Sequence, residues 1–199
     1  MARGVVSFDM GSRNLAYAQV YGEHELMRWG MIDLGRHNAR QCCTNLVELL
    51  ETEFRWVRDS HMDIVVELQP VNGTCKTLSH VMQAYFDMCN REDGGERKFV
   101  FMRAGDKLNY MPAIHKPTSK KDRGKRKQMA MAMTELVLAR EDNEPEMAHF
   151  YQSFPYKQRT DLADALVQGC RYLQKIREGA KTSSSSGTQG VLGSFIDIE

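Results

Sequence analysis

The sequence lacks any long hydrophobic run. None of its segments approaches the roughly 18 consecutive apolar residues that a membrane-spanning helix needs. The N-terminal stretch MARGVVSFDMGSRN also lacks the apolar core of a signal peptide, because Asp9 interrupts its only apolar run. With 199 residues, 42% hydrophobic and 27% charged, the chain can form one globular domain with a sizeable core. We therefore expect an intracellular protein that does not bind a membrane.

Cysteine is also scarce. The chain has 5 cysteines, an odd number, and no two of them form a C-x-x-C pair. Their neighbours are largely apolar, as is usual for buried thiols. We interpret these cysteines as reduced and structural: Cys42, Cys43, Cys75, Cys89 and Cys170.

Charge is nearly balanced overall but unevenly distributed. The net charge is +1, yet the segment KPTSKKDRGKRK alone carries about +6, so the rest of the chain is acidic. Its basic residues are Lys116, Lys120, Lys121, Arg123, Lys125, Arg126 and Lys127. Such a block is most often a solvated loop or the exposed start of a helix. The functional interpretation is a surface that contacts phosphate groups.

Hydrophobic periodicity predicts an α/β domain. Alternating or continuous apolar runs indicate strands, and apolar residues at spacings of three and four indicate helices. The predicted strands are 4–9, 14–20, 25–34, 62–68 and 97–102. The predicted helices are 39–58, 75–91, about 119–140 and about 159–177, with a loop from 103 to about 118. This order predicts a five-stranded mixed sheet, with a three-stranded antiparallel meander and two parallel strands, flanked by helices over residues 1–177.

Two acidic residues end predicted strands. Asp9 closes the first apolar run just before Gly11, where a turn-capping role is a reasonable alternative. Glu67 is the only charged residue in IVVELQP, at the end of an otherwise apolar strand. A buried carboxylate without a partner is costly, which favours a function for Glu67. If the two strands are neighbours, both side chains lie at the same edge of the sheet.

A second acidic pair lies near the start of the last predicted helix. Asp161 and Asp164 are three residues apart in RTDLADALVQG, so they point from the same helical face. Acids near a helix N-terminus are often structural, but apolar residues surround these two. Four converging carboxylates would repel one another unless a cation neutralised them. Mg²⁺ or Mn²⁺ suits such oxygen ligands.

The acidic motifs resemble those of a known family. The strings D-M-G-S-R-N-L-A from Asp9, E-L-Q from Glu67 and D-L-A-D from Asp161 are similar to the successive motifs of RuvC-like Holliday-junction resolvases. The resemblance is nearest to the poxvirus-type and fungal mitochondrial branches and spans about residues 4–177. It implies a ribonuclease H-like fold and a catalytic, metal-binding tetrad of Asp9, Glu67, Asp161 and Asp164.

The same resemblance implies a reaction and partners. Two divalent ions about 4 Å apart would support in-line hydrolysis of a phosphodiester in branched DNA, without a protein nucleophile. A C2 homodimer is expected, because two strands are cut symmetrically. Lys121 is a candidate for approaching the scissile phosphate, while Gln69 and Asn14 could bind nucleic acid or serve as structural amides. Leu166 replaces the histidine that some bacterial members carry, so no histidine-assisted step is expected there.

Three other functions remain open. A ribonuclease H-type nuclease would use the same acids on RNA–DNA hybrids or flaps. A nucleotide-binding protein of the actin and sugar-kinase type shares a D-x-G-x-x-N opening, but it needs a second such domain. A non-catalytic DNA-binding protein could also retain the fold. Cleavage assays on different substrates distinguish these functions.

The C-terminal segment is polar and low in complexity. Residues 178–199 include GAKTSSSSGTQG, which predicts a disordered tail. Its end has the spacing Q-x-x-L-x-x-F-I, from Gln189, Leu192, Phe195 and Ile196. This resembles the peptide by which replication enzymes bind sliding clamps, although the last position there is normally aromatic. The alternatives are a chance apolar end or a segment that folds back onto the domain.

Overall fold

A mixed five-stranded sheet forms the centre of the protein. The computed structural model describes residues 4–11, 13–22, 24–35, 38–69, 73–110 and 123–185. The strands are β1 (Gly4–Met10), β2 (Asn14–Tyr21), β3 (Glu25–Asp33), β4 (Asp63–Glu67) and β5 (Phe99–Met102). Their order in the sheet is β3-β2-β1-β4-β5. The first three strands are antiparallel, and β4 and β5 continue the sheet in parallel with β1. The predicted mixed sheet is therefore confirmed.

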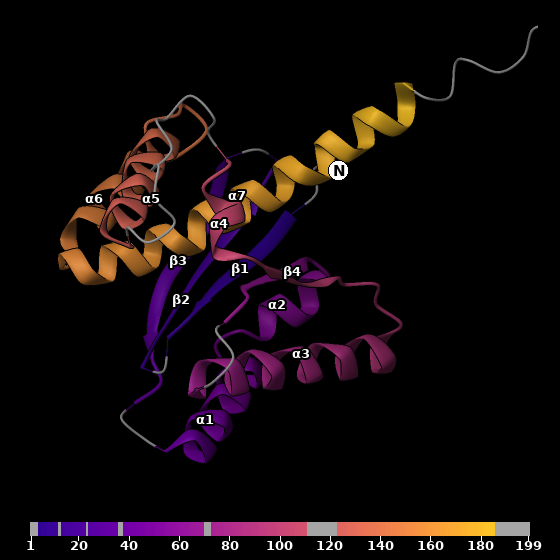
Figure 1. Ribbon diagram of the computed structural model, residues 1–199. Helices are drawn as coiled ribbons and strands as arrows, with labels where there is room; N and C mark the ends of the chain where they lie inside the picture. Colours follow the sequence, from indigo (N-terminus) through magenta and orange to yellow (C-terminus); the bar gives the residue numbers. More distant parts are fainter. Residues whose placement is uncertain are drawn as a thin grey trace, which may run out of the picture.

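Helices cover both faces of the sheet (Figure 1). One layer contains α1 (Ala39–Glu51), α2 (Arg55–Ser60) and α3 (Thr74–Asp93). The opposite layer contains α5 (Arg123–Leu138), α6 (Pro145–Ser153) and α7 (Tyr156–Ser185), which crosses β1 and β2. The short helix α4 (Ala104–Lys107) follows β5 and contacts α7. Within the described ranges, no helix is long and apolar enough to span a membrane.

The structure differs from the sequence prediction in two segments, one in the α1–α3 layer and one directly after β5. The single helix predicted over 39–58 is two helices, with the break at Thr52. The buried ring of Phe54 packs edge-to-face against Phe8 and Tyr17, at centroid distances of 5.3 and 4.9 Å. Because these contacts place Phe54 in the core just after the break, the apolar periodicity continues across it. The predicted loop from Arg103 contains α4.

Two further differences lie in the α5–α7 layer. Helix α6 was not predicted: it begins with a proline at Pro145 and buries only Tyr151 fully, so its apolar pattern is weak. Helix α7 extends beyond the predicted 159–177, running to Ser185, so the predicted domain boundary at 178 falls inside a helix. An ion pair of 3.2 Å between Arg171 and Glu178 spans that boundary. Gly179 weakened the sequence signal, but one glycine costs a helix only about 1 kcal/mol.

The remaining C-terminal prediction concerns residues beyond α7. The proposed clamp-binding positions Gln189, Leu192, Phe195 and Ile196 lie outside the described residues, and the disordered tail stays a prediction for this segment.

Strand alternation directs the acidic side chains toward α7. Val5 of β1 and Val65 of β4 pack in the core beneath α7, whereas Phe8 packs in the core beneath α1 and α3. Successive side chains of a strand point to opposite faces. Asp9 is four residues after Val5 and Glu67 is two after Val65, so both carboxylates face the α7 side.

One buried amide fixes α7 against the sheet. The Gln168 Nε2 atom lies 3.0 Å from Ser7 Oγ, 3.2 Å from the Phe8 carbonyl oxygen and 3.2 Å from the Val65 carbonyl oxygen. At the next position, a Cβ atom on Gly169 would meet the Cβ of Ser7 at 3.2 Å. The amide and the close approach together set the height of α7 above β1 and β4.

A buried histidine joins the β2–β3 connection to the rest of the α7 layer. His24 is 7% exposed, and its Nδ1 is hydrogen-bonded to the Tyr110 hydroxyl. Asn143 accepts a hydrogen bond from the Leu26 backbone N–H and donates one to the His24 carbonyl oxygen. Burial, reinforced by Arg140, lowers the pKa of His24 to about 4 against the opposing effect of Asp142. The neutral imidazole is therefore the form that the fold favours.

We expect this histidine to make the protein less stable in mild acid. The unfolded chain binds a proton below about pH 6.5, whereas folded His24 does so only near pH 4, so stability is lost between these values. At pH 5 the loss should be on the order of 1–2 kcal/mol. Urea unfolding at pH 7.5 and pH 5 should show that His24→Gln, although less stable at pH 7.5, loses less than the wild type. Equal losses in both proteins would assign the acid sensitivity to other groups.

Candidate active site

The four predicted acidic residues line one pocket. The pocket has a volume of about 830 Å³ and lies where the carboxyl ends of β1 and β4 meet α7. Asp9 comes from β1, Glu67 from β4, and Asp161 and Asp164 from α7. The sheet and α7 thus bring together carboxylates that are far apart in the sequence.

The pairing of β1 and β4 sets the first two acids side by side. The strands are parallel, with Phe8 opposite Val66, so Asp9 and Glu67 are the next residues of adjacent strands. Both face α7, and carboxylate groups at this edge can reach a common ligand.

A tight turn follows Asp9. The Gly11 backbone N–H donates a 3.0 Å hydrogen bond to the Asn14 carbonyl oxygen. A Cβ atom on Gly11 would lie 2.4 Å from that same oxygen, a distance that real Cβ atoms do not reach. Glycine is therefore required by close backbone approach, and a side chain here would displace the strand end that carries Asp9.

Helix α7 places the second acidic pair. Asp161 and Asp164 lie in the first three turns of α7, which begins at Tyr156, and Leu162 between them is fully buried. The Trp29 indole donates a 3.1 Å hydrogen bond to the Leu162 carbonyl oxygen, which ties this turn to β3. The acids therefore lie on a part of the helix that is held by the sheet.

Lys107 lies among these acids and was not predicted as a site residue. From α4, its ammonium forms an ion pair with Glu67 and another with Asp164, whose Oδ1 lies 2.9 Å away. Its side chain is only 8% exposed. A sequence signal did exist: strand 97–102 was expected to be parallel, so residues just after it should reach the same sheet edge as Asp9 and Glu67. The denser basic block further along the chain obscures this signal.

The pocket disfavours the ionised form of Asp9. Burial raises the pKa of Asp9 well above its usual range; Lys107 opposes this, while the Asp164, Glu67 and Asp161 carboxylates raise the pKa further. Burial alone would lower the pKa of Lys107, but the surrounding carboxylates outweigh it and raise that pKa. The negative charge of the cluster is thus only partly compensated by this lysine.

Asp161 has a second basic neighbour. Burial raises the pKa of Asp161, and Asp164 adds to the effect, whereas Lys127 opposes it. The Lys127 ammonium lies 4.0 Å from Asp161 Oδ1 and donates a 3.0 Å hydrogen bond to Thr160 Oγ1. Lys127 therefore belongs to the wall of the same pocket.

The chemistry of the donor set fits a divalent metal ion. Asp9, Glu67, Asp161 and Asp164 offer the hard oxygen ligands that Mg²⁺ and Mn²⁺ prefer, in a cluster short of positive charge. Within the described residues, however, no group of three or more Asp, Glu, His or Cys side chains is arranged closely enough to hold one ion. The ammonium of Lys107 lies against two of the four acids instead.

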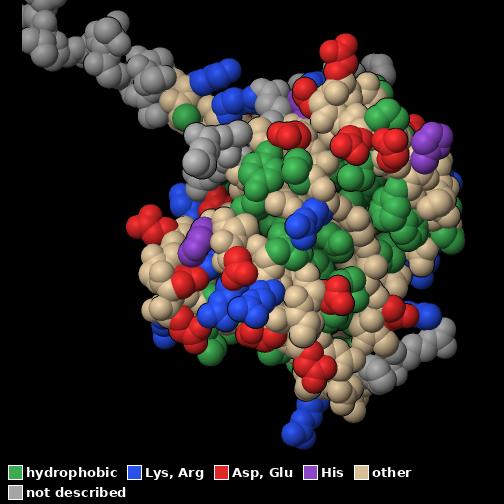
Figure 2. Space-filling model, turned by 180° about the vertical axis from the view of Figure 1, so that it is seen from behind, with side chains coloured by type: hydrophobic (Ala, Val, Ile, Leu, Met, Phe, Trp, Pro, Cys, Tyr) green, Lys and Arg blue, Asp and Glu red, His purple; other side chains and the backbone are tan. Residues whose placement is uncertain are grey.

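A basic rim surrounds the acids. We use this term for Arg126 and Lys127 at the start of α5 and Lys157 at the start of α7, all of which line the pocket. Lys157 was not predicted, although it precedes Asp161 by four residues and so shares its helical face. On the face shown in Figure 2, in contrast, described acidic and basic side chains are interspersed around a hydrophobic area. At the pocket, three basic side chains lie next to the four acids.

The other predicted nucleic-acid-binding residues have varied positions. Gln69 lines the pocket, whereas Asn14 begins β2 and is not among the described residues lining it. Lys125 is exposed on α5, and Arg123 begins that helix with a side chain outside the description. The residues that lie outside the described ranges altogether are Lys116, Lys120 and Lys121.

Comparison with solved structures identifies the fold. The fowlpox virus resolvase, solved with substrate Holliday-junction DNA, is 14% identical with a TM-score of 0.58, over 88% of this chain and 99% of that chain. RuvC of T. thermophilus in complex with a Holliday-junction substrate is 14% identical with a TM-score of 0.55, over 88% and 96%. A further T. thermophilus RuvC structure is 15% identical with a TM-score of 0.56, over 88% of this chain and 96% of that chain.

No protein-family model and no curated protein matches the chain. Each structural match covers 88% of this chain and at least 96% of the solved chain. The chain therefore has the ribonuclease H-like fold of the RuvC-type resolvases.

Proposed function

We propose that the protein is a metal-dependent endonuclease that resolves Holliday junctions or related branched DNA. One observation carries the proposal: four carboxylates from β1, β4 and α7 converge on a pocket with a basic rim. The fold is shared with a viral and a bacterial resolvase that were solved with junction DNA, which supports this choice of substrate.

The acidic and the basic residues of the pocket would have different roles. Asp9, Glu67, Asp161 and Asp164 would hold divalent metal. Bound Mg²⁺ or Mn²⁺ would supply an activated water and neutralise charge on the phosphate and on the leaving 3′ oxygen. The basic rim would attract the sugar–phosphate backbone to an otherwise acidic site and hold it across the pocket. The reaction proposed is hydrolysis of a phosphodiester, with a 5′-phosphate and a 3′-hydroxyl as products.

The substrate of this pocket can be tested directly. A synthetic four-way junction, incubated with and without Mg²⁺ or Mn²⁺ and analysed on a denaturing gel, should be cut only when metal is present. Linear duplex of the same sequence is the matched control. Preferred cleavage of an RNA–DNA hybrid or a flap would indicate a ribonuclease H-type nuclease instead. Junction binding without any cleavage would indicate a non-catalytic DNA-binding protein.

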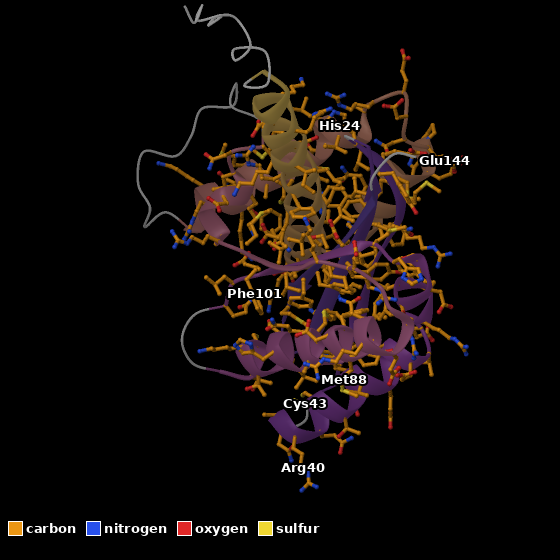
Figure 3. The ribbon with its side chains drawn as sticks, turned by 90° about the vertical axis from the view of Figure 1, so that its right-hand side faces the viewer. His24, Arg40, Cys43, Met88, Phe101 and Glu144 are labelled. Carbon is orange, nitrogen blue, oxygen red and sulfur yellow. The ribbon has the colours of Figure 1, made fainter. Side chains whose placement is uncertain are left out.

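We further propose that the protein acts as a homodimer, because resolution requires two symmetric cuts. The proposed contact uses the α1–α3 layer, where Met88 is 59% exposed and Val47 is 37% exposed. Figure 3 shows Met88 and Cys43 on this layer, on the opposite side of the sheet from Glu144. Light scattering should give twice the monomer mass, and Met88→Lys should shift the protein toward monomer.

The proposed setting is recombination and replication of viral DNA, which the similarity to the fowlpox virus enzyme supports. Binding of the C-terminal segment to a sliding clamp remains a separate proposal from the sequence. A peptide of residues 186–199 should bind the cognate clamp in a titration, and Phe195→Ala should remove that binding.

A further inference from the structure

The centre of the acidic cluster already contains a cation from the chain itself. Lys107 reaches it from α4 and is ion-paired with both Glu67 and Asp164. These two acids come from a strand and a helix that are distant in sequence, so the ammonium bridges β4 and α7. Asp9 belongs to the same electrostatic cluster, so three carboxylates act on this one ammonium.

An ammonium and a divalent ion would compete for the same oxygen atoms. A carboxylate oxygen 2.9 Å from the Lys107 ammonium faces that group and would have to turn from it to coordinate metal. If the ammonium and a metal ion both contacted the same carboxylate, the two cations would also repel each other strongly in this buried site. This competition explains why four suitable acids line one pocket while no three described acids surround a single ion position.

The local structure allows the ammonium to move without moving its helix. Lysine has a flexible four-carbon side chain, and Lys107 lines a pocket large enough to receive the displaced group. The backbone of α4 is held separately, because the helix packs against α7 and the next residue, Leu108, is buried in the core. Exchange therefore requires a rotation of one side chain.

We infer that Lys107 is a built-in counter-ion, which keeps the acids paired in the metal-free protein and is displaced from Glu67 and Asp164 when divalent metal binds. The inference rests on the proposed function, since it takes these acids to be metal ligands. The exchange makes and breaks no covalent bond. It replaces one positive charge in the cluster by two, which suits four carboxylates better.

Metal binding in the absence of DNA tests the inference. Mn²⁺ is titrated into wild type and Lys107→Met, and the free ion is followed by electron paramagnetic resonance. Removing the competitor should tighten Mn²⁺ binding by about tenfold or more, a change in Kd that such a titration resolves well. Metal-free Lys107→Met should melt at a lower temperature than wild type, and added Mn²⁺ should raise its melting temperature by more.

Lys175→Met is the matched control. It makes the same substitution and loses an ion pair to the same short helix, but its partner Asp106 is not one of the four acids. Its Mn²⁺ affinity should equal that of wild type. Equal or weaker Mn²⁺ binding by Lys107→Met would overturn the inference, whereas failure of wild type and both lysine variants to bind Mn²⁺ would overturn the proposed metal site as well.

A charge-conserving variant covers the case in which Lys107→Met does not fold without metal. Lys107→Arg keeps a cation beside Glu67 and Asp164, and its guanidinium can pair with a carboxylate through two hydrogen bonds. A cation that is held more firmly should weaken Mn²⁺ binding relative to wild type. Unchanged or tighter binding by Lys107→Arg would contradict displacement.

Discussion

Asp9→Asn, Glu67→Gln and Asp164→Asn should each reduce cleavage of a four-way junction by roughly 1000-fold or more, equivalent to about 4 kcal/mol of transition-state stabilisation. Each change removes a charged oxygen ligand while keeping the shape of the side chain. Junction binding measured without metal should remain, because the basic rim is unchanged. Asp9→Asn should also fold normally, since it relieves a buried charge that three neighbouring carboxylates oppose.

Asp106→Asn is the control for these variants. Asp106 lies next to Lys107 on α4 but pairs outward with Lys175, so its loss should leave cleavage near the wild-type rate. Rates are best compared in single-turnover reactions, where binding and product release do not limit the signal. A wild-type rate for any of the three acid variants would remove that residue from the catalytic set.

Replacing the basic rim should have the largest effect on DNA affinity. Arg126→Ala, Lys127→Ala and Lys157→Ala combined should weaken binding to junction and duplex alike, because these side chains are expected to contact phosphates and not bases. Each lost contact should reduce the slope of log K against log salt by about 0.9, so the triple variant should lose up to about 3 in slope. Fluorescence anisotropy with labelled DNA at several salt concentrations measures both quantities.

The matched control removes three charges elsewhere. Arg40, Arg55 and Arg91 are exposed on the α1–α3 layer, and their triple alanine variant should bind DNA with a nearly normal salt slope. A second variant, with Lys116, Lys120 and Lys121 changed to Ala, tests the rest of the basic block predicted from the sequence. If the rim variant keeps the wild-type slope, the rim does not contact phosphate.

The acidic half of the site could be predicted because each acid breaks a local pattern. Glu67 is a charge at the end of an apolar strand, and Asp161 and Asp164 interrupt an apolar helical face. Such exceptions are visible without tertiary information. The parallel order of β1 and β4 then follows from the usual connection of strands through helices, so a common sheet edge could be expected for Asp9 and Glu67.

The basic half could be predicted only in part, because lysine on a surface breaks no pattern. Lys107 and Lys157 each stand among ordinary polar neighbours, and their roles depend on where α4 and α7 meet the sheet. The densest basic run drew the prediction toward residues 116–127, of which Arg126 and Lys127 line the pocket. The break after α1 could not be predicted either, since the buried Phe54 continues the apolar spacing through a turn.

The position of α7 after all five strands in the sequence has a consequence for biosynthesis. β1 and β4 leave the ribosome early, but they carry only Asp9 and Glu67. Asp161 and Asp164 arrive later, with α7, and Gln168 can bond to the Ser7 hydroxyl and to the Phe8 and Val65 carbonyl oxygens only when that helix packs on the sheet. A nascent or prematurely terminated chain therefore holds half of the acidic cluster. All four carboxylates can meet only after α7 has been synthesised and has packed on the sheet.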